Sequence, residues 1–111
     1  MERDAIMSAG TLKTWSQVHA WFKRYKDCDD GSIAEGFTES ITVLLAKHWS
    51  QLPALAARME KDADFGSFVL KHIDATADVR NLKRIERNAK SKCPSAYAQL
   101  CAQFIARVHD Q

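Results

Sequence analysis

The chain has 111 residues, of which 46% are hydrophobic and 27% charged, a composition that fits one globular domain and excludes a disordered polymer. Its formal net charge of +2 is too small to imply a nucleic-acid or membrane partner by itself. The longest apolar run, residues 43–46, is far shorter than the roughly 20 residues that cross a bilayer. Residue types that favour helices dominate, with only four Gly and two Pro. We therefore predict an all-α fold, a compact bundle of about five to six helices with orthogonal or irregular packing.

Residues 1–10 carry no sustained hydrophobic pattern, so we expect a flexible N-terminal segment followed by a single helical domain over residues 11–111. Glu2 and Asp4 occupy the region where a signal peptide would carry positive charge. The protein is therefore expected to be periplasmic if a leader was removed from its N-terminus, and cytoplasmic otherwise.

The first two helices are predicted from their starting signals. Thr14 and Gln17 match a capping box at the start of a helix over residues 12–26. Ser32 and Glu35 repeat this pattern at the start of a second helix, which is expected to end near Trp49. In both helices apolar residues recur at steps of three and four, so one face of each is predicted to be buried.

The second half of the chain contains four further predicted helices. Pro53 suits the first turn of a short third helix, because its missing N–H is not needed there. Asp62 or Asp64 can cap a fourth helix, and Thr76 or Asp78 a fifth. A Cys-Pro pair at positions 93–94 interrupts the chain before the last helix, whose apolar stripe runs from residue 97 to residue 108.

Carboxylates are concentrated in the loop before the second helix, and Asp29, Asp30 and Glu35 are candidate partner-binding residues there. They are compatible with a favourable helix-dipole interaction, with an acidic protein-binding surface, or with a site for a hard cation. The calcium-loop spacing is not met, because placing Gly31 at the sixth position puts Phe37 where the bidentate Glu belongs.

The fifth predicted helix combines an apolar side with a basic side. At about 100° per residue its five cations fall within an arc of about 120°, opposite Val79, Leu82, Ile85 and Ala89. Such a stripe can be a solvated face, or it can bind an acidic partner or phosphates. The absence of stacking aromatic residues from the stripe argues against nucleic acid. The candidate partner-binding residues are Arg80, Lys83, Arg84 and Arg87, with Lys90 completing the stripe.

The histidines do not form a recognisable site in the sequence. His19, His48 and His72 each lie beside an apolar stripe, and none has a partner at the four-residue spacing of a helical metal site. Glycine-rich phosphate loops and nucleophile-elbow patterns are absent from the sequence. We therefore predict no catalytic, metal or cofactor-binding residues.

The three cysteines leave an odd thiol in any pairing scheme. Cys28 and Cys93 both lie in breaks between predicted helices, whereas Cys101 lies on the apolar face of the last helix. If Cys93 and Cys101 were both helical, about 12 Å along the axis would separate them, which is beyond disulfide reach. Folding back of the Cys-Pro segment would shorten that distance. The candidate disulfide is Cys28–Cys93.

Two segments, CDDGSIAEGF at residues 28–37 and FVLKHIDAT at residues 68–76, together with the Cys-Pro pair, resemble a group of small proteobacterial helical proteins. The resemblance spans about residues 15–105. Members of this group are usually exported and have no assigned activity, so the resemblance implies a periplasmic location if a leader was removed from the N-terminus. A looser similarity, in size, helical class and cysteine content, connects the chain to periplasmic immunity proteins.

We therefore expect a non-enzymatic protein-binding module, such as an inhibitor or an immunity protein against a bacterial toxin, with another protein as its partner and no membrane partner. One alternative is a small enzyme or metal-dependent protein that uses the acidic loop. A second is nucleic-acid binding through the basic helix, which we regard as the weaker reading. The sequence leaves the oligomeric state open.

Overall fold

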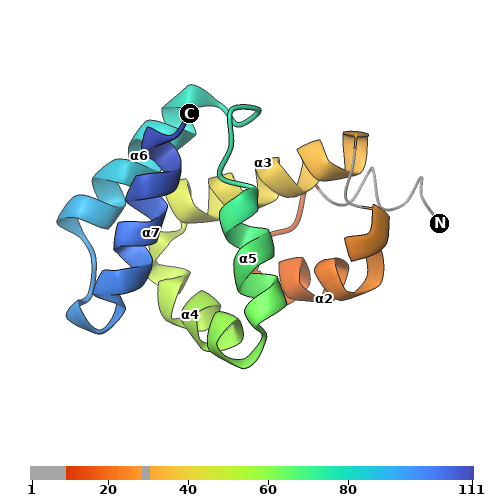
Figure 1. Cartoon of the computed structure of the whole chain (residues 1–111), viewed down its shortest axis with the longest axis horizontal. Coiled ribbons are helices and arrows are strands. Elements are labelled where there is room, and N and C mark those ends of the chain that lie inside the picture. Colours follow the sequence, from red (N-terminus) through yellow and green to blue (C-terminus); the bar gives the residue numbers. More distant parts are fainter. Residues whose placement is uncertain (1–9, 29–30) are drawn as a thin grey trace.

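The computed structural model describes residues 10–28 and 31–111, and every regular element in them is helical (Figure 1). The described chain forms an all-α bundle of six α-helices with short 3-10 turns between them, as predicted. The predicted flexible segment lies, apart from Gly10, outside the described residues. The elements are α2 (Trp15–Tyr25), η1 (Lys26–Cys28), α3 (Gly31–Lys47), η2 (Trp49–Gln51), α4 (Leu52–Lys61), α5 (Ala63–Lys71), α6 (Val79–Ser91), η3 (Ser95–Tyr97) and α7 (Ala98–His109).

Side-chain caps start three of these helices, because the first N–H groups of a helix have no partner within it. Thr14 Oγ1 accepts from the backbone N–H of Gln17 at 3.1 Å and begins α2. Of the predicted alternatives, Asp62 caps α5 by accepting from Phe65 N at 3.1 Å. Asp78 caps α6 because its Oδ1 accepts a hydrogen bond from the backbone N–H of Arg80 at 2.8 Å.

The second helix differs from its prediction at both ends. It begins at Gly31, whose φ of 52° lies in the left-handed region, so Ser32 is inside the helix and does not cap it. It ends at Lys47, two residues before the predicted end near Trp49, where η2 begins. His48 is exposed outside the helix, because its backbone has left the helical region at φ −130° and ψ 43°.

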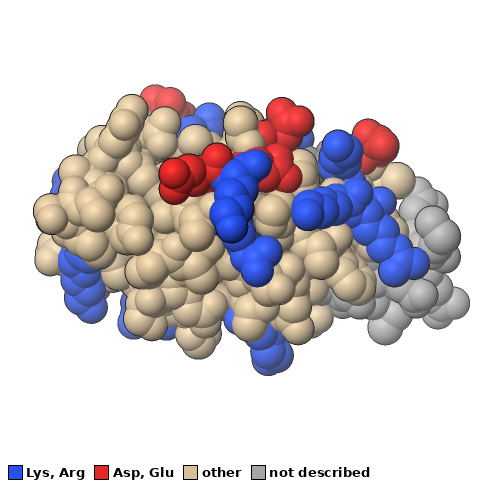
Figure 2. Space-filling model, turned by 90° about the horizontal axis from the view of Figure 1, so that it is seen from below, with Lys and Arg blue, Asp and Glu red and all other residues tan. Residues whose placement is uncertain are grey.

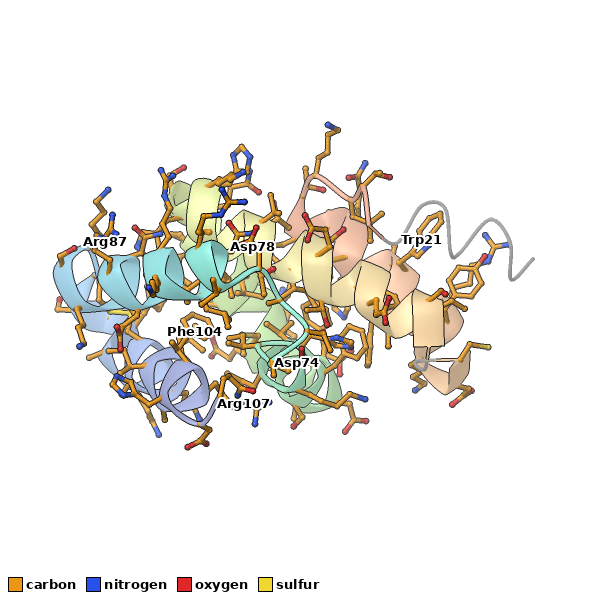
Figure 3. The ribbon with its side chains drawn as sticks, turned by 90° about the horizontal axis from the view of Figure 1, so that it is seen from above. Trp21, Asp74, Asp78, Arg87, Phe104 and Arg107 are labelled. Atoms are coloured by element: carbon orange, nitrogen blue, oxygen red, sulfur yellow. A yellow bond between two sulfur atoms is a disulfide. The ribbon has the colours of Figure 1, made fainter. Side chains whose placement is uncertain are left out.

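The core is built around aromatic side chains from α2, α3 and α5. Phe68 lies with its ring centroid 4.7 Å from that of Phe22 and 4.9 Å from that of Phe37, distances typical of favourable tilted and edge-to-face pairs. Phe65 is fully buried beside them. On α7, Phe104 is also fully buried and lies inside the bundle beneath α6 (Figure 3). These rings belong to one core cluster, to which α4 and α6 contribute aliphatic side chains such as Leu55 and Ile85.

A buried asparagine joins α6 to the end of α3. Asn88 is 4% exposed, and its Nδ2 donates to Leu45 O at 3.0 Å and to Ala46 O at 3.1 Å. These carbonyls belong to the last turn of α3, where helical partners run out. Asn88 therefore caps α3 from a neighbouring helix and sets the rotation of α6 about its own axis.

The cysteine prediction is wrong in its pairing. Cys93 is bonded to Cys101, with a Cα–Cα distance of 6.3 Å, and Cys28 is a free thiol. The helical distance of about 12 Å does not apply, because α6 ends at Ser91 and η3 turns the chain back before α7 begins. The bond therefore closes the α6–α7 hairpin.

Among the described helices, none has the length and apolar content required to cross a membrane.

Candidate functional site

The cations of α6 lie on its solvent side, as the sequence predicts. Leu82, Ile85 and Ala89 are buried on the opposite side, and the hydrogen bond from Asn88 to Leu45 O holds this side against α3. Val79, which the sequence predicts on the same buried side, is 60% exposed in the first turn of the helix. In Figure 3 the Arg87 side chain points away from the bundle. We call the exposed residues of this side the cationic face; they are Arg80, Lys83, Arg84, Arg87 and Lys90.

Two of the five cations have acidic partners. The guanidinium of Arg80 lies 3.1 Å from the Asp78 carboxylate, and Lys90 Nζ lies 3.6 Å from Glu86 Oε2. The side-chain and backbone N–H groups of Arg80 lower the pKa of Asp78 by donating hydrogen bonds to its carboxylate. Glu86 also contacts His109. The Arg80–Asp78 pair is exposed and the Lys90–Glu86 pair is partly exposed, so we expect each to contribute little to stability.

The other three cations are not neutralised. Within the part of the chain that the structure describes, no carboxylate lies within 4.0 Å of Lys83, Arg84 or Arg87. These side chains lie in the middle of the cationic face, between the two ion pairs. The centre of α6 therefore presents three cations that have no ion pair among the described residues, although Glu39 and Asp78 line a hollow together with Arg84.

The positive surface extends onto the end of α3. A hollow of about 320 Å³ lies between η2, the C-terminal turn of α3 and α6, and Lys47, Arg84 and Lys92 line it. Trp49 lines it as well, and its indole Nε1 donates to Lys92 O at 2.9 Å. The aromatic ring is thereby tied to the end of α6 beside three cations.

The predicted acidic site is only partly within the described structure. Glu35 is exposed on α3, and no ion pair of its carboxylate occurs among the described residues. Asp29 and Asp30 lie outside the described residues. Within the ranges that are described, no group of three or more His, Cys, Asp or Glu side chains is placed so as to hold a metal ion.

A second polar cluster joins α2, α4 and α5, and it was not recognised in the sequence. His19 is 7% exposed; its Nε2 lies 3.0 Å from Asp62 Oδ2, and its Nδ1 lies 3.3 Å from Arg58 Nη1. Its ring stacks on Phe65, with centroids 4.1 Å apart. The hydrogen bonds from His19 and from the Phe65 backbone lower the pKa of Asp62.

The cluster opens into a hollow of about 450 Å³, whose lining includes Lys23 and Lys61 in addition to His19, Arg58 and Asp62. Figure 2 shows the molecule from below, with Lys and Arg side chains in the middle and right of that face, where α2 and the α4–α5 junction lie, and with Asp and Glu side chains beside them. The left of the same face is a broad area without charge except at its margin. The hollow is therefore a charged feature distinct from the cationic face of α6.

A third polar cluster is buried except for its half-buried carboxylate, Asp74. Thr38 Oγ1 lies 2.7 Å from His72 Nδ1 and 3.5 Å from Asp74 Oδ2. Thr38 and His72 are each 2% exposed, and the His72 ring meets the Phe68 ring at an angle of 62°. This cluster connects α3 to the end of α5 and has a structural role in the core.

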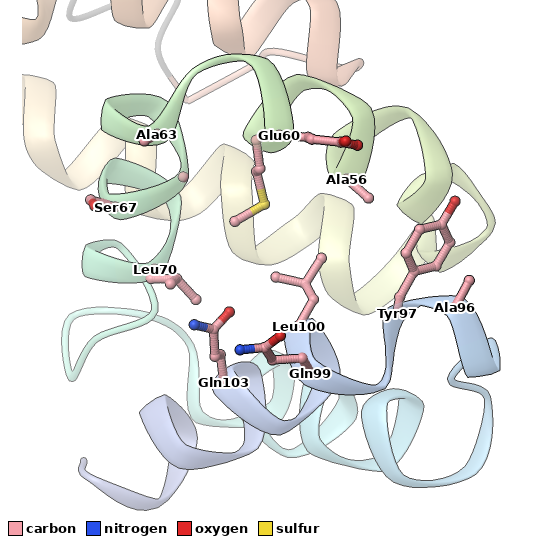
Figure 4. A pocket seen from close by; sticks show the side chains of 12 residues that line it. Ala56, Glu60, Ala63, Ser67, Leu70, Ala96, Tyr97, Gln99, Leu100 and Gln103 are labelled. Carbon is pink, nitrogen blue, oxygen red and sulfur yellow. The ribbon is translucent and has the colours of Figure 1, made fainter.

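A further hollow, of about 490 Å³, is a groove between α4, α5 and α7 (Figure 4). Met59, Leu70 and Leu100 give it apolar walls, while Gln99 and Gln103 project from α7. Glu60 is the single charged residue among those that line it. Its chemistry suits a neutral, largely apolar group.

Sequence reasoning located the cations of α6 but not the cluster around His19. The cationic residues belong to one helix, so their spacing along the chain shows that they share a face. His19 is 39 residues from Arg58 and 43 from Asp62, and no local pattern links positions so far apart. Comparison with protein-family models, with curated proteins and with solved structures finds no match to this chain.

Proposed function

We propose that this protein is a non-enzymatic protein-binding module, an inhibitor or immunity protein against a bacterial toxin, whose cationic face docks on an acidic surface of its partner. The observation that carries the proposal is the set of three adjacent cations, Lys83, Arg84 and Arg87, without acidic partners among the described residues. Three such cations on one helix are a local surplus of positive charge in a chain whose net charge is only +2.

Physical arguments favour a protein partner for this surface. A positive patch facing a negative one accelerates association and selects the partner. The Asn88 hydrogen bonds hold α6 in one orientation, so the helix presents its arginines without first being ordered. Arginine side chains are also enriched at the energetic centres of protein interfaces. The half-buried Trp49 beside Arg84 adds apolar area at the edge of the surface.

The Cys93–Cys101 bond supports a periplasmic location within the same proposal. Disulfides persist in oxidising compartments and are rare in the cytosol. Alkylation of the protein taken directly from cells should modify one thiol, Cys28, before reduction and three after it. Three reactive thiols before reduction would contradict the periplasmic location. A toxin or secretion gene next to the gene for this chain would support the immunity assignment.

The docking surface is tested by charge reversal in cells that make the protein naturally. Wild-type protein, the double variant Lys83→Glu/Arg87→Glu and the matched control Lys13→Glu/Lys26→Glu are used as affinity baits, each variant with the same change in net charge. We expect wild type and control to retain one stoichiometric acidic protein that the α6 variant loses. The purified pair should associate at least ten-fold more slowly when α6 is reversed, and more slowly at high salt.

Two results would overturn the proposal. One is the absence of any stoichiometric partner for the wild-type bait, and the other is equal retention of the partner by the α6 variant. Fluorescent DNA and RNA are titrated in parallel at low salt. Tight binding that weakens steeply with salt and requires Lys83 and Arg87 would replace the protein partner with nucleic acid.

A further inference from the structure

We propose that the hollow between α2 and the α4–α5 junction is a binding site for the phosphate group of a small phosphate monoester. This site is separate from the cationic face of α6, and the inference does not depend on the function proposed for that face. It rests on the hydrogen bonds around His19 and on the charges that line the hollow.

The histidine orients an arginine without neutralising it. With its proton on Nε2, His19 donates to Asp62, and its Nδ1 lone pair accepts from Arg58 Nη1. Burial of the ring and its stacking on Phe65 leave the imidazole little freedom to turn. A carboxylate at the position of the His19 ring would cancel the charge of the Arg58 guanidinium. The imidazole instead accepts one hydrogen bond from the guanidinium and holds that edge of it in position. The remaining N–H groups of Arg58 are left for a ligand in the hollow.

The one carboxylate at the site is already occupied. Asp62 Oδ1 accepts from Phe65 N at 3.1 Å, and Asp62 Oδ2 lies 3.0 Å from His19 Nε2. No carboxylate among the described residues lies within 4.0 Å of the charged nitrogens of Arg58, Lys23 or Lys61. Asp62 therefore builds the site and does not block it.

The surplus charge indicates a dianion. Three cations and one carboxylate line the hollow, which leaves two positive charges without a counterpart. A phosphate monoester carries a charge of about −1.5 to −2 at pH 7 and offers three acceptor oxygens. A volume of about 450 Å³ also leaves room for a small organic group attached to the phosphate.

The test titrates inorganic phosphate into the protein at low ionic strength and follows backbone amide resonances. We expect saturable shifts centred on residues 19–23 and 58–65, with acetate and chloride at least ten-fold weaker. Arg58→Gln should weaken phosphate binding about ten-fold or more, because it removes charge-assisted hydrogen bonds. Lys23→Gln should weaken phosphate binding less, because a lysine contributes a point charge and lacks the planar set of N–H donors of an arginine.

The positioning role of His19 has its own variant. His19→Leu keeps all three cations but frees Arg58 to pair with Asp62, so phosphate affinity should fall although the cationic side chains are unchanged. If this variant does not fold, the Arg58 and Lys23 variants at the partly or fully exposed positions still decide the question. Lys83→Gln/Arg84→Gln, on the cationic face, should bind phosphate as wild type does.

Three outcomes would overturn the site. The first is phosphate binding no tighter than that of acetate or chloride. The second is phosphate binding that survives Arg58→Gln unchanged. The third is phosphate binding that is lost in Lys83→Gln/Arg84→Gln, which would place the anion on α6 instead. Loss of the protein partner in the bait experiment leaves this inference standing, so the two proposals fail separately.

Discussion

Replacing Asn88 by Ala should loosen α6 from α3, and the structure allows the effect to be estimated. The variant removes two hydrogen bonds, of 3.0 and 3.1 Å, from a side chain that is 4% exposed. Two such bonds contribute roughly 2 kcal/mol, and leaving the Leu45 and Ala46 carbonyls without donors adds about 1 kcal/mol. The better helix propensity of Ala offsets about 0.6 kcal/mol. The net loss should be about 2–3 kcal/mol, or roughly 10 °C in Tm.

The assay is urea unfolding followed by far-UV circular dichroism, with unchanged slopes required for a valid comparison. Asn81→Ala is the matched control, because Asn81 is also buried on α6 at 8% exposure but makes no hydrogen bond to a described residue through its side chain. Asn81→Ala changes only the helix propensity, so the unfolding free energy of this variant should stay within about 0.6 kcal/mol of that of wild type. Equal urea midpoints for the two variants would refute the role given to Asn88.

Three further predictions concern the core, the hairpin and the His19 cluster. Phe65→Ala should destabilise the fold by about 3–5 kcal/mol, because it removes a fully buried ring and leaves a cavity. Reduction of Cys93–Cys101 should lower stability by roughly 2.5 kcal/mol, the loop-closure value for a short loop. The lowered pKa of Asp62 means that its carboxylate stabilises the fold above its ordinary pKa of 3.8, and that this contribution is lost as pH falls through the lower folded value.

Each of these has a control in the same chain. Val79→Ala removes a side chain that is 60% exposed and should change the unfolding free energy by less than about 0.5 kcal/mol. Reductant should have no effect on a Cys93→Ser/Cys101→Ser variant. Asp62→Asn keeps a side-chain cap for α5 but cannot ionise, so its stability should fall less than that of wild type between pH 5 and pH 2. Parallel acid curves for the two proteins would contradict the assignment.

The helices could be predicted largely from the sequence, because their signals are local. A cap acts on an N–H group two or three residues away, as Thr14, Asp62 and Asp78 do, and an amphipathic stripe depends only on spacing along one helix. The cationic face followed from the same spacing. The ends of α3 were predicted wrongly because the backbone changes conformation at Gly31 and before η2. The spacing of apolar residues carries no information about such a change.

Long-range neighbours were decided only by the tertiary structure. The turn through η3 brings Cys93 and Cys101 to a Cα–Cα distance of 6.3 Å, leaving Cys28 without its predicted partner. The packing of α2 against the α4–α5 junction places His19 between Arg58 and Asp62, residues about 40 positions further along the chain. Helix formation is set by neighbouring residues, whereas the contacts between helices depend on how their buried faces fit together. The sequence thus determines which faces are apolar or charged, and the packing determines which charges meet.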